Sequence, residues 1–109
     1  MNRLATSFWV QAYLTRLRLQ DIQGFVVTHG DDTAGAVVVK INTLDGRAAA
    51  FNRSFDLAAD KRHWVEFAAG DEAEVDDAIT RQRGFDPDLW VVEVEDRQGR
   101  HLLGESGLE

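Results

Sequence analysis

The sequence predicts an α+β domain in which an antiparallel sheet of about six strands carries two helices packed on one face. One segment has apolar residues at helical spacing, a second has acidic residues in its first turns and arginines in its last turn, and six have the alternation or the apolar run of a strand. They follow one another as helix, four strands, helix, two strands, and short connections join antiparallel neighbours. We therefore expect a single compact domain over residues 1–104 and a polar C-terminal tail at 105–109.

The first helix is expected over about residues 5–20. Its apolar residues recur at spacings of three and four, so they line one stripe of a helix. The stripe consists of Ala5, Phe8, Trp9, Ala12, Tyr13 and Leu17. Gly24 follows the segment, at a place where a left-handed residue often ends a helix.

Four strands are expected between the two helices. The runs FVVTH and AVVVKIN, at 25–29 and 36–42, are rich in β-branched residues and flank the turn GDDTAG. A third strand follows the turn TLDGR, and RHWVEF at 62–67 forms the fourth. Because these connections are short, each strand is expected to pair with its neighbour in the chain.

The hairpin around TLDGR has a predictable register. A three-residue loop with Gly46 in the left-handed conformation pairs Ile41 with Ala49, which gathers the apolar residues of both strands on one face. A shift of one residue would send this apolar set to the solvent, so we predict the three-residue loop. The opposite face then carries Lys40, Asn42, Asn52 and Ser54.

The second helix is expected over about residues 72–83, within GDEAEVDDAITRQRGF. Its acidic residues crowd the N-terminal turns while Arg81 and Arg83 occupy the last turn, an arrangement that suits the helix dipole. Beyond it, Asp86 and Pro87 are expected to form a turn in which the carboxylate accepts backbone N–H groups.

The last two strands are expected to form a hairpin. The segment LWVVEVE alternates, so Val92 and Val94 face the core while Glu93 and Glu95 face the other way. A three-residue loop in DRQGR pairs Glu95 with His101 at about 5 Å between Cβ atoms. Glu93, Glu95 and His101 are therefore expected to share one face.

These three residues are candidate metal ligands. Two carboxylates and an imidazole suit a hard or borderline metal, which in an enzyme would activate water or oxygen. The other interpretation is an exposed strand end with a stabilising Glu–His pair. We favour the structural interpretation, because the wet face of an antiparallel sheet is commonly polar. We predict no cofactor and no catalytic residue.

The same face of the predicted sheet carries apolar side chains that neither helix is expected to cover. They are Val38, Leu89, Val91 and Leu103. An exposed apolar patch often marks association. It predicts a non-enzymatic protein-interaction or binding module that acts on an unidentified protein partner or as a homodimer.

Charge and composition exclude several classes of protein. The chain of 109 residues has a net charge of −7, and an acidic surface repels phosphate backbones, so no nucleic-acid partner is expected. Only Trp64, after Lys61, Arg62 and His63, places an aromatic ring among basic residues, which is weak evidence for a stacking platform. No apolar run approaches the ~20 residues of a membrane helix, so we expect a cytoplasmic protein with no membrane partner.

Three segments carry a family resemblance: RLATSFWVQAYLTRLRLQ, GAVVVKINTLDGRA and especially RQRGFDPDLWVVEVEDRQGRHLL. They resemble the small alphaproteobacterial proteins grouped as domain of unknown function 1491, and the resemblance covers nearly the whole chain. It implies a bacterial, cytoplasmic, stand-alone protein. It supplies no activity, ligand or catalytic residue.

Overall fold

The computed structural model describes residues 5–108, apart from the side chain of Phe55. Residues 1–4 of the predicted domain and residue 109 of the predicted tail lie outside the described residues. The described elements are α1 (Thr6–Leu19), β1 (Gln23–Thr28), β2 (Val37–Asn42), β3 (Arg47–Asp56), β4 (Lys61–Asp71), α2 (Glu72–Phe85) and β5 (Trp90–Glu95).

The strands of the described chain form one mixed sheet in the order β1-β5-β2-β3-β4. β5 lies between β1 and β2, antiparallel to β1 and parallel to β2, while β2, β3 and β4 pair antiparallel in succession. The predicted α+β class is confirmed. The prediction of an antiparallel sheet with about six strands is only roughly right, because the described sheet has five strands and one parallel pair.

The expected sixth strand does not form because β5 has no free edge. Gly99 adopts the predicted left-handed conformation, with φ 71°. The chain then leaves the sheet, since β1 and β2 already occupy both sides of β5. Residues 97–108, called here the C-terminal segment, contain no strand. Glu95 is consequently placed beside Gln23 of β1 and Asn42 of β2 rather than beside His101.

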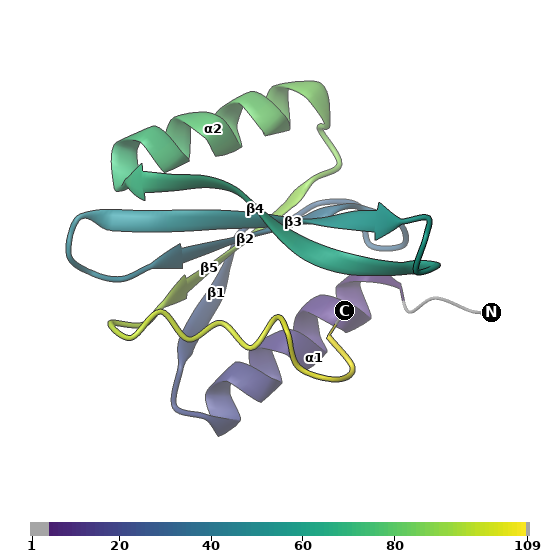
Figure 1. Ribbon diagram of the computed structural model, residues 1–109, viewed down its shortest axis with the longest axis horizontal. Helices are drawn as coiled ribbons and strands as arrows, with labels where there is room; N and C mark the ends of the chain where they lie inside the picture. The colour runs from purple at the N-terminus through teal and green to yellow at the C-terminus, as the bar shows by residue number, and fades with distance from the viewer. Residues whose placement is uncertain (1–4, 109) are drawn as a thin grey trace.

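The two helices lie on opposite faces of the sheet, so the prediction that they share one face is wrong (Figure 1). The cause is the composition of the two inner strands. Val37 and Val39 of β2 face the α1 side, and Val38 faces the α2 side together with Val91 of β5. Strands that are apolar on both faces require cover on both, and one helix supplies it on each side.

The β2–β3 hairpin has the predicted register. Ile41 lies opposite Ala49 and Val39 opposite Phe51. Gly46 adopts the left-handed conformation that the three-residue loop requires, with φ 86°, and Leu44 in the same loop also has a positive φ. The alternation of apolar residues was therefore sufficient to fix this local pairing.

The C-terminal segment packs on the α1 side of the sheet (Figure 1). The Tyr13 hydroxyl donates a 2.7 Å hydrogen bond to the His101 carbonyl oxygen, and Arg16 donates to the Ser106 carbonyl and to Glu105. Leu108 is only 1% exposed. Of the described residues in the predicted polar tail, Leu108 is therefore packed in the core, whereas Glu105, Ser106 and Gly107 are exposed.

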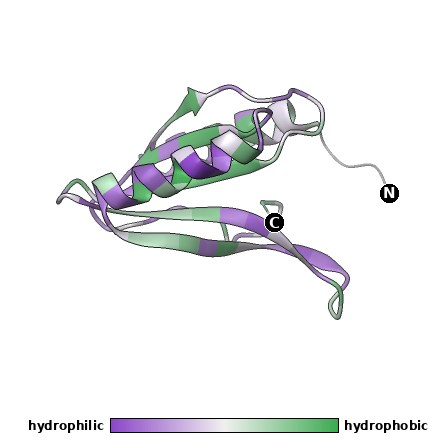
Figure 2. Ribbon diagram, turned by 90° about the horizontal axis from the view of Figure 1, so that it is seen from above, coloured by the Kyte–Doolittle hydropathy of each residue, from purple (hydrophilic) through white to green (hydrophobic). Residues whose placement is uncertain are grey.

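The second helix presents hydrophilic residues outward above the sheet, and the β3–β4 hairpin extends beyond it (Figure 2). Val75 and Ile79 are the buried residues of α2. Between residues 5 and 108, neither helix is long and apolar enough to cross a membrane.

Candidate functional site

The structure does not bring the three candidate metal ligands together. Glu93 lies on the α2 side of the sheet, where it contacts Lys40 and Asn42. His101 lies on the α1 side, with its ring centroid 4.9 Å from that of Phe51. No group of three or more histidine, aspartate or glutamate residues in the described part of the chain could hold a metal ion. The metal-dependent alternative is therefore not favoured.

The four residues predicted to form an exposed patch are buried. Val38, Leu89 and Val91 are at most 4% exposed and pack with α2, whereas Leu103 is 2% exposed and belongs to the core on the α1 side. The prediction placed both helices on one face and so left the other uncovered. Because α2 covers that face, Val38, Leu89 and Val91 are not exposed to solvent.

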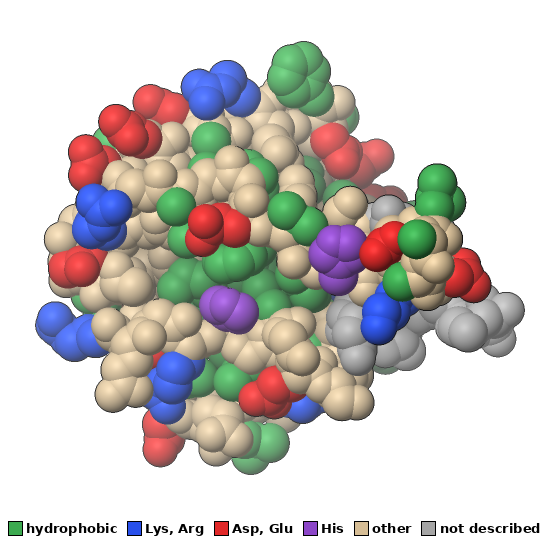
Figure 3. All heavy atoms as spheres, viewed as in Figure 1, with side chains coloured by type: hydrophobic (Ala, Val, Ile, Leu, Met, Phe, Trp, Pro, Cys, Tyr) green, Lys and Arg blue, Asp and Glu red, His purple; other side chains and the backbone are tan. Residues whose placement is uncertain are grey.

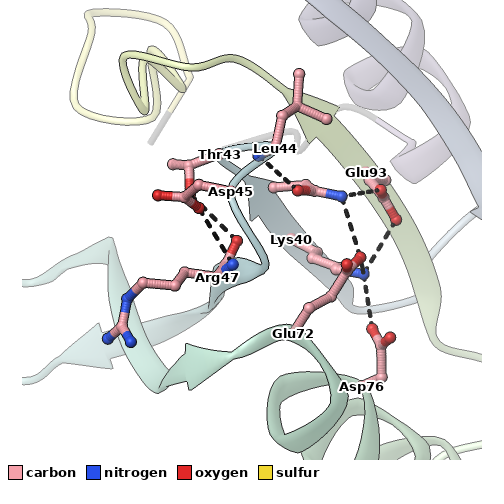
Figure 4. Close-up of polar contacts among 9 residues, drawn as sticks. Lys40, Thr43, Leu44, Asp45, Arg47, Glu72, Asp76 and Glu93 are labelled. Carbon is pink, nitrogen blue, oxygen red and sulfur yellow. Dashed lines mark hydrogen bonds and ion pairs between the residues drawn. The ribbon is translucent and has the colours of Figure 1, made fainter.

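An ionic cluster surrounds a buried lysine beneath α2 (Figure 4). The Lys40 ammonium nitrogen is 2.7 Å from Glu72 and 2.7 Å from Asp76, both on α2, and 3.4 Å from Glu93 on β5. Asn42 donates to both Glu72 and Glu93, at 3.0 and 3.2 Å. The lysine side chain is 6% exposed, although it was expected on an open polar face. The cluster joins α2 to the two central strands.

The charge state of Lys40 decides what this cluster can do. Burial disfavours the charged form, but hydrogen bonds to Asp76 and Glu72 and the Coulombic attraction of Glu93 and Asp76 outweigh it and raise the Lys40 pKa. A lysine nucleophile or general base requires the opposite shift. Lys40 therefore remains a permanent cation that holds α2 on the sheet.

A groove opens on the α1 side, between the edge strand β4 and the C-terminal segment. It has a volume of about 570 Å³. Figure 3 shows a hollow on this face with hydrophobic side chains at its floor and histidine side chains exposed around it. The groove is lined by Phe51, Lys61, Arg62, His63, Trp64, His101, Leu103 and Gly104.

The aromatic wall of the groove is fixed by contacts behind it. The Trp64 indole N–H donates a 2.8 Å hydrogen bond to the Leu108 carbonyl oxygen, and its ring lies 5.3 Å from that of Trp9. The Arg53 guanidinium stacks over both indole rings, at 4.4 Å from the Trp9 centroid and 4.8 Å from the Trp64 centroid. Trp64 is therefore held in one orientation, as a binding surface requires.

His101 contributes a neutral imidazole to the groove. Burial lowers the pKa of His101 below its ordinary value of 6.5, so the ring is neutral at pH 7. Its Nδ1 accepts a 3.0 Å hydrogen bond from the Leu103 backbone N–H. The ring proton must then reside on Nε2, and no described residue accepts a hydrogen bond from that atom. The groove thus has a hydrogen-bond donor with no protein partner among residues 5–108.

The charges at the groove contrast with those of the whole chain. Lys61 and Arg62 belong to its lining, and none of the lining residues is acidic. The complete sequence has 12 basic and 19 acidic residues, with a net charge of −7. A basic lining on an acidic protein favours an anion locally and disfavours a cation.

Sequence reasoning missed both arrangements. Lys40 was placed on a solvated face, because the carboxylates of α2 that surround it lie more than thirty residues further along the chain. The groove joins β4 to residues 101–104, which no motif spacing connects. The available signal was the run KRHW at 61–64, where basic residues precede Trp64.

Comparisons with known proteins agree with this fold. The family described as "Protein of unknown function (DUF1491)" matches residues 4–104. A crystal structure of a DUF1491 family protein from Caulobacter crescentus CB15 is 38% identical, with a TM-score of 0.81 and 94% of each chain covered. An NMR structure of a DUF1491 family protein from the same organism is 36% identical over 96% of each chain, also with a TM-score of 0.81.

The solution structure of protein Atu0922 from A. tumefaciens is 29% identical, with a TM-score of 0.73 and 86% of each chain covered. No curated protein matches the chain.

Proposed function

The chain belongs to the DUF1491 family of proteins of unknown function, and we propose that it is a non-enzymatic binding module whose ligand occupies the groove between β4 and the C-terminal segment. The observation that carries this proposal is the groove itself. Its volume of about 570 Å³ is in the range of small-molecule sites, and aromatic rings form part of its wall.

The chemistry of the lining supports binding rather than catalysis. The described lining residues provide no hydroxyl, thiol or carboxylate that could act as a nucleophile or pair with a histidine as a general base. They provide instead apolar surface, positive charge and N–H hydrogen-bond donors. Such groups orient a ligand without transforming it.

A screen of small-molecule fragments by ¹H–¹⁵N NMR tests the proposal. The indole N–H of Trp64 reports on the groove, and that of Trp90 is an internal control, because it is bonded to the Asp31 carbonyl oxygen outside the groove. Fragments that move the Trp64 signal and leave Trp90 in place support a groove ligand. If every fragment that binds leaves the Trp64 signal in place, the proposal of a groove ligand is contradicted.

Self-association is a second candidate function, and one observation favours it. β1 is an edge strand whose Phe25, Val26 and Val27 are 41%, 37% and 54% exposed. No charged residue lies within Gln23–Thr28, although exposed strand edges are usually protected by charge or proline. A second copy could therefore pair along this edge.

Size-exclusion chromatography with light scattering across a dilution series tests this homodimer. The variant Val27→Lys would place a charge on the edge and abolish pairing. Leu57→Lys is the matched control, because Leu57 is 87% exposed in the β3–β4 turn and away from β1. A wild-type monomer at high concentration would refute the homodimer.

A further inference from the structure

We infer that the ligand of the groove is a small organic anion in which a flat apolar body carries a carboxylate group. This inference rests on the proposed function and names the chemical class that the site would take. Three features of the groove carry it: its aromatic wall, its unpartnered N–H donor and its local positive charge.

The aromatic wall selects a flat apolar body. Phe51 and Trp64 line the groove together with Leu103. Trp64 is only partly buried by the protein, and its indole N–H is already used by Leu108. The ring thus offers its apolar surface to a ligand and no hydrogen bond. A planar hydrocarbon body is the natural partner of such a surface, since offset aromatic contacts add to the gain from burial.

The anionic group follows from the donor and the charges. His101 Nε2–H is a neutral donor with no described acceptor, and Lys61 adds a positive charge to the lining. The described lining has no carboxylate that would repel an anion. A neutral imidazole donor beside a lysine ammonium suits a monoanionic carboxylate, because each of its two oxygens can accept a hydrogen bond from one of these groups. A phosphate group would compete for the same donors, and the 1-naphthyl phosphate probe tests that alternative.

Four naphthalene derivatives separate the contribution of the aromatic ring from that of the attached group, because they share the ring and differ in charge. They are 1-naphthoate, 1-naphthalenemethanol, 1-naphthylmethylammonium and 1-naphthyl phosphate. Titration calorimetry at pH 7.5 gives each affinity, and the NMR signal of the Trp64 indole N–H locates the binding. We expect 1-naphthoate to bind about tenfold more tightly than the alcohol, the gain of one charge-assisted hydrogen bond. The ammonium compound should bind most weakly.

Two variants assign the selectivity to the groove. Lys61→Glu should weaken the binding of 1-naphthoate. Arg97→Glu is the control and should not weaken it, because it makes the same charge change at an exposed turn outside the lining. His101→Asn keeps an acceptor near the position of Nδ1 for the Leu103 N–H but is too short to donate from the position of Nε2. It should weaken the binding of 1-naphthoate more than that of 1-naphthalenemethanol, because the charged carboxylate accepts the stronger hydrogen bond.

The outcomes distinguish this inference from the function on which it rests. If the four compounds shift the Trp64 signal with equal affinities, or if the phosphate binds more tightly than the carboxylate, the ligand class is refuted and the binding module stands. If no compound and no fragment shifts the Trp64 signal, the proposed function fails with it. Selective binding of 1-naphthoate that Lys61→Glu weakens supports the inference.

Discussion

The indole nitrogen of Trp64 lies 2.8 Å from the carbonyl oxygen of Leu108, to which it donates a hydrogen bond across 44 positions of the chain. This contact joins the edge strand β4 to the end of the C-terminal segment. This bond and the burial of Leu108 therefore help to position both walls of the groove. The shape of the groove should depend on residues that do not line it.

Replacement of Leu108 by alanine tests this dependence. We expect the free energy of unfolding to fall by about 2 kcal/mol, the lower end for a buried leucine, because a chain end can partly fill the cavity. Leu57→Ala, at a side chain that is 87% exposed, should change it by less than about 0.5 kcal/mol. Urea unfolding of the two variants makes the comparison, and equal effects would show that the C-terminal segment does not contribute to the core.

The Lys40 cluster should stabilise the fold. Lys40→Met leaves Glu72, Asp76 and Glu93 without their cation. We expect a loss of about 2 kcal/mol, less than for a fully buried ion pair, because Glu72 and Asp76 are 37% and 52% exposed. The double variant Lys40→Met/Glu93→Leu should regain part of this loss, because it removes the most buried of the three carboxylates. Lys61→Met is the control at an exposed lysine. Denaturant unfolding measures all three, and a neutral Lys40→Met would contradict the role of the cluster.

The lowered pKa of His101 should make the stability of the protein depend on pH. Burial lowers its pKa in the folded protein below the value of 6.5 in the unfolded chain, so the unfolded chain binds the proton more readily. The free energy of unfolding should be unaffected by this group above pH 6.5 and should fall as the pH decreases from 6.5 towards the folded pKa. In His101→Asn this decrease should be smaller, whereas in His63→Asn, at an exposed histidine, it should persist. Identical pH profiles for both variants would contradict the assignment.

Alanine substitutions at two glycines should change the stability of the protein in opposite directions. A Cβ at Gly30 would lie 2.2 Å from the Asp88 carbonyl oxygen and 2.6 Å from Trp90, so Gly30→Ala should destabilise the protein. A Cβ at Gly84, inside α2, meets nothing within 4 Å. Gly84→Ala should stabilise the protein by about 0.5–1 kcal/mol through helix propensity. Thermal unfolding of both variants tests the close packing of residue 30 on the start of β5.

Local patterns in the sequence predicted local structure well. Apolar spacing located the first helix, the charge pattern located the second, and the alternation around Gly46 gave the pairing of Ile41 with Ala49. The Asp86 turn also forms as expected, with the Asp88 backbone N–H bonded to the Asp86 carboxylate at 3.1 Å. In each case the partners are near neighbours in the chain, so the pattern that predicts the element also determines its contacts.

The long-range contacts could not be predicted in the same way. β5 pairs in parallel with β2, from which β3, β4 and α2 separate it in the sequence. Because β5 lies between β1 and β2, a further strand cannot pair with it to form the predicted C-terminal hairpin. The run Val37-Val38-Val39 does indicate a strand buried on both faces, and that signal would have placed the helices on opposite sides. The groove has no comparable signal, since His101 and Trp64 meet only through the tertiary fold.

The central claim is that the groove between β4 and the C-terminal segment binds an aromatic carboxylate. A titration of ¹⁵N-labelled protein with 1-naphthoate, followed at the tryptophan indole signals, tests it most directly. We predict a saturable shift of the Trp64 signal while the Trp90 signal, from an indole bonded to Asp31 outside the groove, remains in place. A Trp64 signal that stays unchanged, or one that moves together with Trp90 in proportion to ligand concentration without saturation, would contradict the account.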